Sequence, residues 1–205
     1  MADRQSTLPG KKGACFVLRG KNAEANLAHL SEVQPYWNYG WCSETIAEQP
    51  KDIVFVPMVF CGAKCDQMMQ DRIDGIQAQM DKGQAFSMLL AFNEPDKKEQ
   101  SNMTVEKCLH YWKQLESLGV PLCSPSCANP LGCAKAEDAC QGVAGSWMRD
   151  FMTKIEKEGL RCDYVGVHWY GGPNFKGFCH RMEKIHEAYD RPLILTEFAV
   201  ADWKA

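Results

Sequence analysis

Short apolar runs alternate along the chain with segments whose apolar residues recur every three or four positions. Runs such as Ile53-Val54-Phe55-Val56 and Leu193-Ile194-Leu195 are continuous, which is typical of strands buried on both faces. The pattern predicts seven strands, at Gly13–Arg19, Pro35–Trp41, Ile53–Phe60, Phe86–Phe92, Val120–Cys123, Tyr164–Tyr170 and Leu193–Phe198. Strand-like and helix-like segments in alternation indicate a parallel sheet crossed by helices.

Helices are predicted between these strands. The clearest starts after Thr104, which can cap it, and ends at Gly119, with one apolar stripe between them. The others are expected from Asn22 to about Glu32, between Asp66 and Met80, from Ser146 to Gly159, and over Phe178–Tyr189. Because an amphipathic helix must cover something, we interpret these stripes as core rather than as binding surfaces.

Seven strands joined by crossover helices predict an α/β fold, namely a (β/α)₈ TIM barrel truncated after strand seven. Such barrels typically need about 250 residues, and this chain has 205. An open doubly wound sheet is the alternative, but Arg19-Gly20-Lys21-Asn22 is not a glycine-rich phosphate-binding turn. We expect residues 1–12 to be an extended or disordered N-terminal segment and residues 13–205 to form the barrel. The segment Cys127–Gly145 predicts a long surface loop.

The composition excludes several classes of partner. Lys plus Arg is 23 against 26 Asp plus Glu, so the chain lacks the concentrated positive charge that binding to nucleic acid requires. The longest apolar run, around Ile53–Phe60, is too short to cross a membrane. The first ten residues have no apolar core of a secretory signal, so we expect either a protein that stays inside the cell or a mature or trimmed chain.

The 11 cysteines form an odd set, so full disulfide pairing would leave at least one thiol over. They suit either a secreted barrel with a few bridges or a chain that uses Cys as a small buried hydrophobe. The spacings Cys61-x₃-Cys65 and Cys123-x₃-Cys127-x₅-Cys133-x₆-Cys140 do not give the paired C-x₂-C pattern of a structural zinc site. We therefore expect no metal.

Two glutamates stand at the ends of predicted strands. Glu94 follows the fourth strand, in Asn93-Glu94-Pro95, and Glu197 closes the seventh, in Thr196-Glu197-Phe198. These strands face each other across the barrel mouth, so the two carboxyl groups can converge on one bound molecule. Such a pair suits glycoside cleavage, in which one carboxyl protonates the leaving oxygen and the other attacks the sugar or activates water. Either Glu alone would equally fit a strand-end carboxylate held by Arg or Lys, but the pair favours function.

Aromatic residues and one histidine accompany the two glutamates. His168 and Tyr170 are two positions apart and should point the same way on a strand, with Trp169 pointing opposite. For His168 we rank sugar contact before a core role and a metal role last, because nothing nearby completes a ligand set. Stacking on sugar faces, or packing against helices, is expected of Trp37, Tyr39, Trp41 and Trp203.

An ordered set of five motifs resembles the clan A retaining glycosidases and, more narrowly, glycoside hydrolase family 128. The motifs are Trp37-Asn38-Tyr39-Gly40-Trp41, Phe55-Val56-Pro57-Met58, Asn93-Glu94-Pro95, Gly166-Val167-His168-Trp169-Tyr170-Gly171 and Leu195-Thr196-Glu197-Phe198-Ala199. The likeness runs from about Gly13 to Trp203. The family comprises (β/α)₈ endo-β-1,3-glucanases and related glucan-binding members, so the resemblance implies that an eighth strand and helix are missing here.

The resemblance also implies roles for single residues. Glu94 would be the acid/base and Glu197 the nucleophile of a retaining double displacement on β-1,3-glucan, with Asn93 donating to the sugar's 2-hydroxyl. The implied substrate-binding residues are Asn93, His168, Trp169, Tyr170, Trp37, Tyr39 and Trp41. The implied protein is a monomer without a cofactor, its partner is a β-glucan oligosaccharide or polysaccharide, and its location is extracellular or in the cell wall. The alternatives are a non-catalytic β-glucan-binding protein and a clan A hydrolase for another β-glycan, such as mannan or a β-1,4-glucan.

The mechanism requires the two carboxyl groups to have opposed pKa values. Glu94 should stay protonated at rest, which calls for an apolar or anionic setting. Glu197 should stay charged, which calls for hydrogen-bond donors such as Tyr170 or His168.

Overall fold

The computed structural model describes residues 9–60, 66–131 and 146–200. The strands are β1 (Gly13–Cys15), β2 (Trp37–Tyr39), β3 (Val54–Phe55), β4 (Met58–Val59), β5 (Leu89–Ala91), β6 (Leu122–Cys123), β7 (Val165–Gly171) and β8 (Leu193–Val200). The helices are η1 (Gly20–Asn22), α1 (Ala23–Val33), α2 (Asp66–Asp81), α3 (Val105–Ser117), α4 (Ser146–Lys157) and α5 (Phe175–Tyr189). Residues 1–8 of the expected N-terminal segment, most of the expected surface loop, Cys61, Cys65 and Trp203 lie outside the described residues.

All strand pairs are parallel and follow the order of the sequence. Three sheets have the orders β1-β2-β3, β4-β5-β6 and β7-β8. Parallel bridges from Cys123 to Tyr164 and from Cys127 to Val167 continue the arrangement from β6 to β7. The third predicted strand is divided into β3 and β4, because Pro57 between them has no N–H for a ladder. Every predicted strand position is therefore occupied, by strands mostly shorter than the apolar runs.

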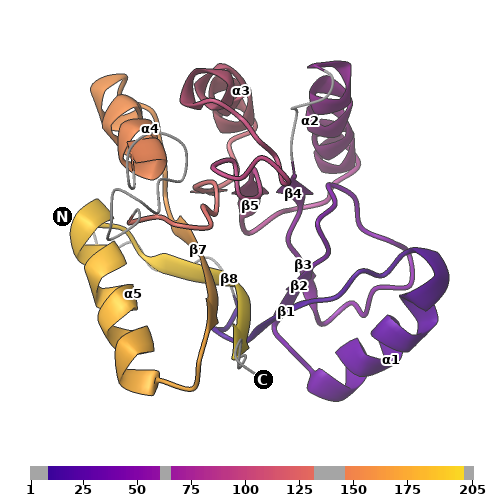
Figure 1. The fold of residues 1–205 in the computed structure, drawn as a ribbon. Helices are drawn as coiled ribbons and strands as arrows, with labels where there is room; N and C mark the ends of the chain where they lie inside the picture. The colour runs from indigo at the N-terminus through magenta and orange to yellow at the C-terminus, as the bar shows by residue number, and fades with distance from the viewer. Residues whose placement is uncertain (1–8, 61–65, 132–145, 201–205) are drawn as a thin grey trace.

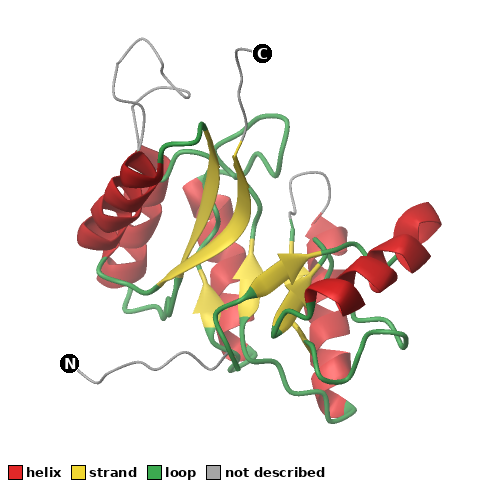
Figure 2. Cartoon of the chain, turned by 90° about the horizontal axis from the view of Figure 1, so that it is seen from below, coloured by secondary structure: helices red, strands yellow, loops and turns green. Residues whose placement is uncertain are grey.

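The helices cover the outer side of an arc of strands. Figure 1 shows α1 to α5 following one another around the strands, with no helix on the side between α5 and α1 among the described residues. Figure 2 shows the same arrangement from below, with helices on both sides of the strands. Within the described ranges β1 pairs only with β2 and β8 only with β7, so the parallel α/β fold is present but a closed barrel is not seen.

Helix boundaries follow local capping chemistry. The Thr104 side chain accepts a hydrogen bond from the Lys107 N–H and starts α3, as its sequence predicts. By contrast, α5 starts three residues earlier than expected, because the Asn174 side chain accepts from the Gly177 N–H at 2.9 Å. Of the described helices, none is both long and apolar enough to cross a membrane.

Two apolar clusters lie on the two sides of the strands. The larger lies between the strands and the helices and includes Trp112 of α3 and Phe151, whose rings meet edge to face. The smaller fills the inside of the arc and includes Trp37, Tyr39 and Leu90. Strands buried on both sides explain the continuous apolar runs of the sequence.

Candidate active site

Glu94 is fixed by main-chain hydrogen bonds at the carboxyl end of β5. Its N–H donates to the Ser126 carbonyl at 2.9 Å, and the Asn93 N–H donates to the Phe60 carbonyl at 2.9 Å. The backbone at Glu94 has φ of 41°, a left-handed conformation that side chains other than glycine rarely adopt. Such strain is characteristic of functional sites, where the surrounding structure enforces it.

Glu197 is placed by an irregularity in β8. Val167 pairs with Leu195 and His168 pairs with Glu197, so Thr196 is an extra residue on the β8 side of the ladder. The Thr196 hydroxyl donates to the Val167 carbonyl at 3.2 Å and is hydrogen-bonded to the Ser126 hydroxyl at 3.0 Å. A bulge of this kind redirects side chains, and here it lets both Thr196 and Glu197 reach the inside of the arc.

His168 of β7 joins the two carboxyl groups. Its Nδ1 lies 3.0 Å from Oε1 of Glu94 and 3.5 Å from Oε2 of Glu197. One oxygen of each Glu and the His168 nitrogen all lie within 4.8 Å of one another. His168 and Glu94 are each only 5% exposed. The side chains therefore meet at one point, although their positions in the sequence are far apart.

The same three groups have spacings that could hold a metal ion. The expectation that nothing completes a ligand set with His168 is therefore wrong, because β5 and β8 bring two carboxylates to it.

Two neutral donors hold the Glu197 carboxylate. The Trp41 indole N–H donates to Oε1 at 2.9 Å, and the Tyr170 hydroxyl donates to Oε2 at 2.6 Å. Donors of this kind favour the charged form of a carboxyl group. Burial, followed by its hydrogen bond and proximity to Glu197, raises the pKa of Tyr170, so this phenol remains a donor. Tyr170 is a donor that the sequence suggested, and Trp41 is one that it did not.

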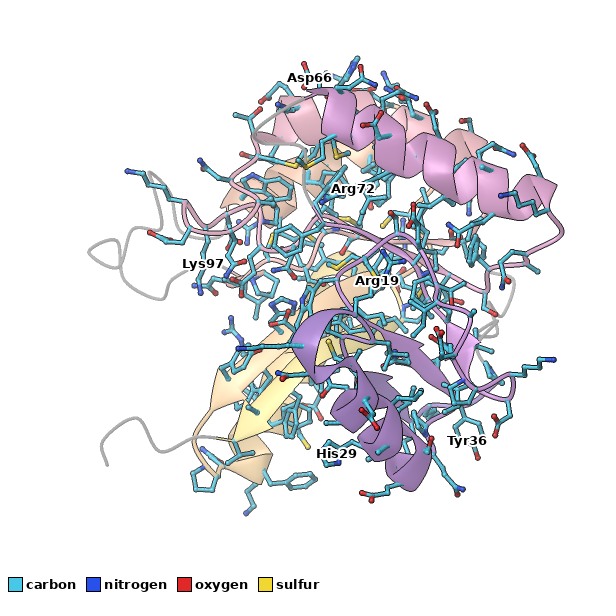
Figure 3. All side chains as sticks on the ribbon, turned by 90° about the vertical axis from the view of Figure 1, so that its right-hand side faces the viewer. Arg19, His29, Tyr36, Asp66, Arg72 and Lys97 are labelled. Carbon is cyan, nitrogen blue, oxygen red and sulfur yellow. The ribbon has the colours of Figure 1, made fainter. Side chains whose placement is uncertain are left out.

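Glu94 lies in a cationic setting rather than the apolar or anionic one expected. Burial raises the pKa of Glu94, but the hydrogen bonds and charges of His168 and Lys97 together outweigh it, so the pKa is lowered overall. Lys97 Nζ lies 3.5 Å from Oε2 of Glu94. Figure 3 shows Lys97 on the opposite side of the molecule from Tyr36, which precedes β2, in keeping with a site where the strands end.

A cavity of about 1070 Å³ adjoins Glu197 and extends along the edges of β1 and β8. Trp41 and Tyr170 line it beside the carboxylate. Its volume slightly exceeds the range of about 300–1,000 Å³ that small-molecule pockets occupy.

Comparisons with known proteins agree with this geometry. The family model described as "Glycosyl hydrolase catalytic core" matches residues 13–205. A family 128 (subgroup I) endo-β-1,3-glucanase from Amycolatopsis mediterranei, solved with laminaripentaose, is similar at 30% identity and a TM-score of 0.73, over 96% of this chain and 74% of that one. This chain belongs to glycoside hydrolase family 128. It is a glycosidase.

More distant members of family 128 share the fold. One is a subgroup II endo-β-1,3-glucanase from Sorangium cellulosum, at 23% identity and a TM-score of 0.70, over 95% of this chain and 76% of that one. Another is a subgroup VII oligosaccharide-binding protein from Trichoderma gamsii, at 19% identity and a TM-score of 0.68, over 98% and 71%. No curated protein matches the sequence significantly.

Three aromatic residues expected to bind sugar in this family 128 glycosidase are largely packed against other side chains. Trp37 and Tyr39 line the cavity beside Glu197 but are only 5% and 1% exposed. Both belong to the cluster inside the arc, because β2 directs them there. Trp169 points away from Glu197 and packs edge to face on Phe178 of α5 at 5.3 Å, in keeping with the alternation expected of β7.

Asn93, His168, Tyr170 and Trp41 remain at the site of the family 128 glycosidase. The Asn93 amide donates to Gln100 Oε1 at 3.3 Å, and its Oδ1 is buried without a hydrogen-bond partner in the described part of the chain. Lys97 was missed by sequence reasoning, and the signal that could have found it is its spacing, one turn after Glu94.

Proposed function

We propose that this family 128 glycosidase cleaves β-1,3-glucan internally, by a retaining double displacement. Glu197 would be the nucleophile and Glu94 the acid/base. The observation that carries the proposal is the close approach of their carboxyl groups, with one oxygen of each within 4.8 Å. Retaining glycosidases hold the two groups about 5–5.5 Å apart, whereas inverting ones need about 6.5–9.5 Å to admit a water molecule.

The hydrogen bonds around Glu197 support its role as nucleophile. Its carboxylate, which accepts hydrogen bonds from Trp41 and Tyr170, would attack the anomeric carbon while protonated Glu94 gives its proton to the leaving oxygen. Water would then attack the glycosyl-enzyme, lose a proton to Glu94 and release the sugar with its original configuration. His168 and Lys97 favour the charged form of Glu94, so the protonated fraction of Glu94 falls at lower pH than for an isolated carboxyl, and we expect an acidic optimum.

The substrate is proposed from the relatives. The endo-β-1,3-glucanase of Amycolatopsis mediterranei has been solved with laminaritriose and laminarihexaose. The cavity beside Glu197 runs along the edges of two strands and has room for a sugar next to this carboxyl group.

We also propose that the arc follows the (β/α)₈ barrel plan. Support comes from strands that pair in sequence order, with helices on the outside after β1, β4, β5, β6 and β7.

Hydrolysis of laminaripentaose, followed by proton NMR, tests the function. We expect shorter laminarioligosaccharides whose newly formed reducing ends appear first as the β-anomer, and loss of this activity in Glu94→Gln and Glu197→Gln. An α-anomer as first product would exclude retention. Binding of laminaripentaose without products from the unmodified chain would instead indicate an oligosaccharide-binding protein, and cleavage only of mannan or a β-1,4-glucan would change the substrate.

A further inference from the structure

The strand that carries Glu197 has a strand neighbour on one side only. β8 pairs with β7, and no pairing with β1 is present among the described residues. The other edge of β8 borders the cavity. The edges of β1 and β8 both line this cavity, for example through Ala14 and Ile194. The distance of Glu197 from the rest of the site must therefore be set by contacts other than a second ladder.

Tyr39 of β2 supplies one such contact across the arc. Its hydroxyl donates to the Thr196 carbonyl at 2.7 Å. Thr196 is the bulge residue, which the paired register of β7 and β8 leaves out. The bond is buried, so it is shielded from competition by water. Tyr39 thus fixes the main chain immediately before Glu197.

Trp41 supplies the second contact, on the carboxylate itself. Its backbone has φ of 52°, a left-handed conformation that is unfavourable for a tryptophan and turns its indole toward Glu197. A Cβ atom at the preceding Gly40 would lie 2.8 Å from the Phe16 carbonyl oxygen, so only glycine lets this turn lie against the chain after β1. The Trp41 and Tyr39 rings meet edge to face at 5.6 Å.

We propose that Trp41 is the positioning residue of the nucleophile, and that Tyr39 and Trp41 together hold Glu197 from across the arc, at the edge of β8 that pairs with no other described strand. Trp41 then acts through Glu197 and not as a stacking platform for sugar. The kinetic part of this inference rests on the proposed function; the hydrogen bond and its effect on the carboxylate do not.

The other groups around Glu197 do not replace Trp41. Tyr170 donates to the other oxygen and is 49% exposed. His168 Nδ1 lies 3.0 Å from the Glu94 carboxylate and 3.5 Å from the Glu197 carboxylate, so His168 contacts Glu94 more closely. Among the described residues, Trp41 donates the hydrogen bond to Oε1 of Glu197.

The remaining titratable neighbours stay neutral over an ordinary assay range. Burial raises the pKa of the Cys15 thiol to about 12. Burial also raises the pKa of Tyr39, and burial with the bond to Glu197 raises that of Tyr170. The other ionisable side chains that face Glu197 are Glu94 and His168.

The kinetic test compares Trp41→Phe with Trp37→Phe. Trp37 is a matched control, because it is a tryptophan of β2, four residues before Trp41, and its buried indole N–H has no hydrogen-bond partner among the described groups. Without the indole N–H, the Glu197 carboxylate is no longer held in one position, which should affect the chemical step more than substrate binding. For Trp41→Phe we expect a fall in kcat of about 10-fold or more, with KM changed less than about 2-fold. Trp37→Phe should not reproduce this difference between kcat and KM.

A spectroscopic test is independent of catalysis. In the ¹⁵N-labelled protein, the indole N–H resonance that disappears in Trp41→Phe should shift in Glu197→Gln. Tyr39→Phe, which removes only a hydroxyl group, should reduce kcat and broaden or move the same resonance. An unchanged kcat in folded Trp41→Phe, or a Trp41 resonance indifferent to Glu197→Gln, would overturn the inference. Absence of hydrolysis with a responsive resonance would refute the proposed function alone.

Discussion

β5 and β8 carry the two carboxyl groups, and they differ in what surrounds them. β5 lies between β4 and β6, and main-chain hydrogen bonds hold Glu94 at its end. β8 is paired on one side among the described residues, and side chains from the turn after β2 and from β7 hold Glu197. The surroundings differ as well, since Lys97 lies beside Glu94 alone, His168 is nearer to Glu94, and Glu197 accepts hydrogen bonds from two neutral donors. Main-chain hydrogen bonds within the sheet therefore position Glu94, whereas side chains that reach across the arc position Glu197.

The largest contrast should appear when each carboxyl is removed in turn. Glu94→Gln should lower laminarin hydrolysis by about 10²–10⁴-fold, the usual range for a general acid/base. A dinitrophenyl β-laminaribioside needs no proton on its leaving group, so Glu94→Gln should still release a burst of dinitrophenol. Glu197→Gln should release none, because no nucleophile remains.

Stopped-flow absorbance measures this burst, and added azide provides the control. Azide should speed turnover of Glu94→Gln by replacing the activated water. A burst from Glu197→Gln, with none from Glu94→Gln, would reverse the two assignments.

Stability should also separate the two strands. Leu90 of β5 is 1% exposed and Ile194 of β8 is half-buried, and both contact the cluster inside the arc. Leu90→Ala should lower the free energy of unfolding by about 2–5 kcal/mol. Ile194→Ala should cost about half as much or less, because it removes less buried apolar area. Urea unfolding measures both, and equal losses would mean that β8 is held as firmly as β5.

A smaller effect should follow from removing the lysine beside Glu94. Lys97→Met raises the pKa of Glu94, which must be protonated to act as an acid, so the alkaline limb of kcat/KM should move to higher pH. The Lys97 side chain is 51% exposed, and solvent screening should keep the shift below about one unit. Lys98→Met, the same change at the next position, is the control. A shift to lower pH, or equal shifts in both variants, would contradict this role for Lys97.

The sequence predicts the strand positions and their order because each buried strand leaves a continuous apolar run. Glu94 and Glu197 stand out for the same reason, since each is a carboxylate at the end of such a run. The bulge at Thr196 could not be predicted, because strict alternation from Ile194 would direct Glu197 toward α5. The donor role of Trp41 was equally hidden, since it depends on a left-handed turn and on a partner 156 positions away.

The setting of Glu94 shows a different limit. A carboxyl group at a strand end is visible in the sequence, but the charge around it depends on which side chains the other strands bring near. His168 comes from β7 and reaches Glu94 only when the strands are assembled. The expectation of an apolar or anionic setting followed from the reaction, whereas the observed setting follows from the fold.

The left-handed backbone at Glu94 implies that catalysis and heat resistance oppose each other at this position. Glycine adopts such a conformation without steric penalty and would also remove a desolvated carboxylate. An inactive Glu94→Gly enzyme should therefore melt no lower than the parent, and selection for thermostability alone would favour loss of the acid/base.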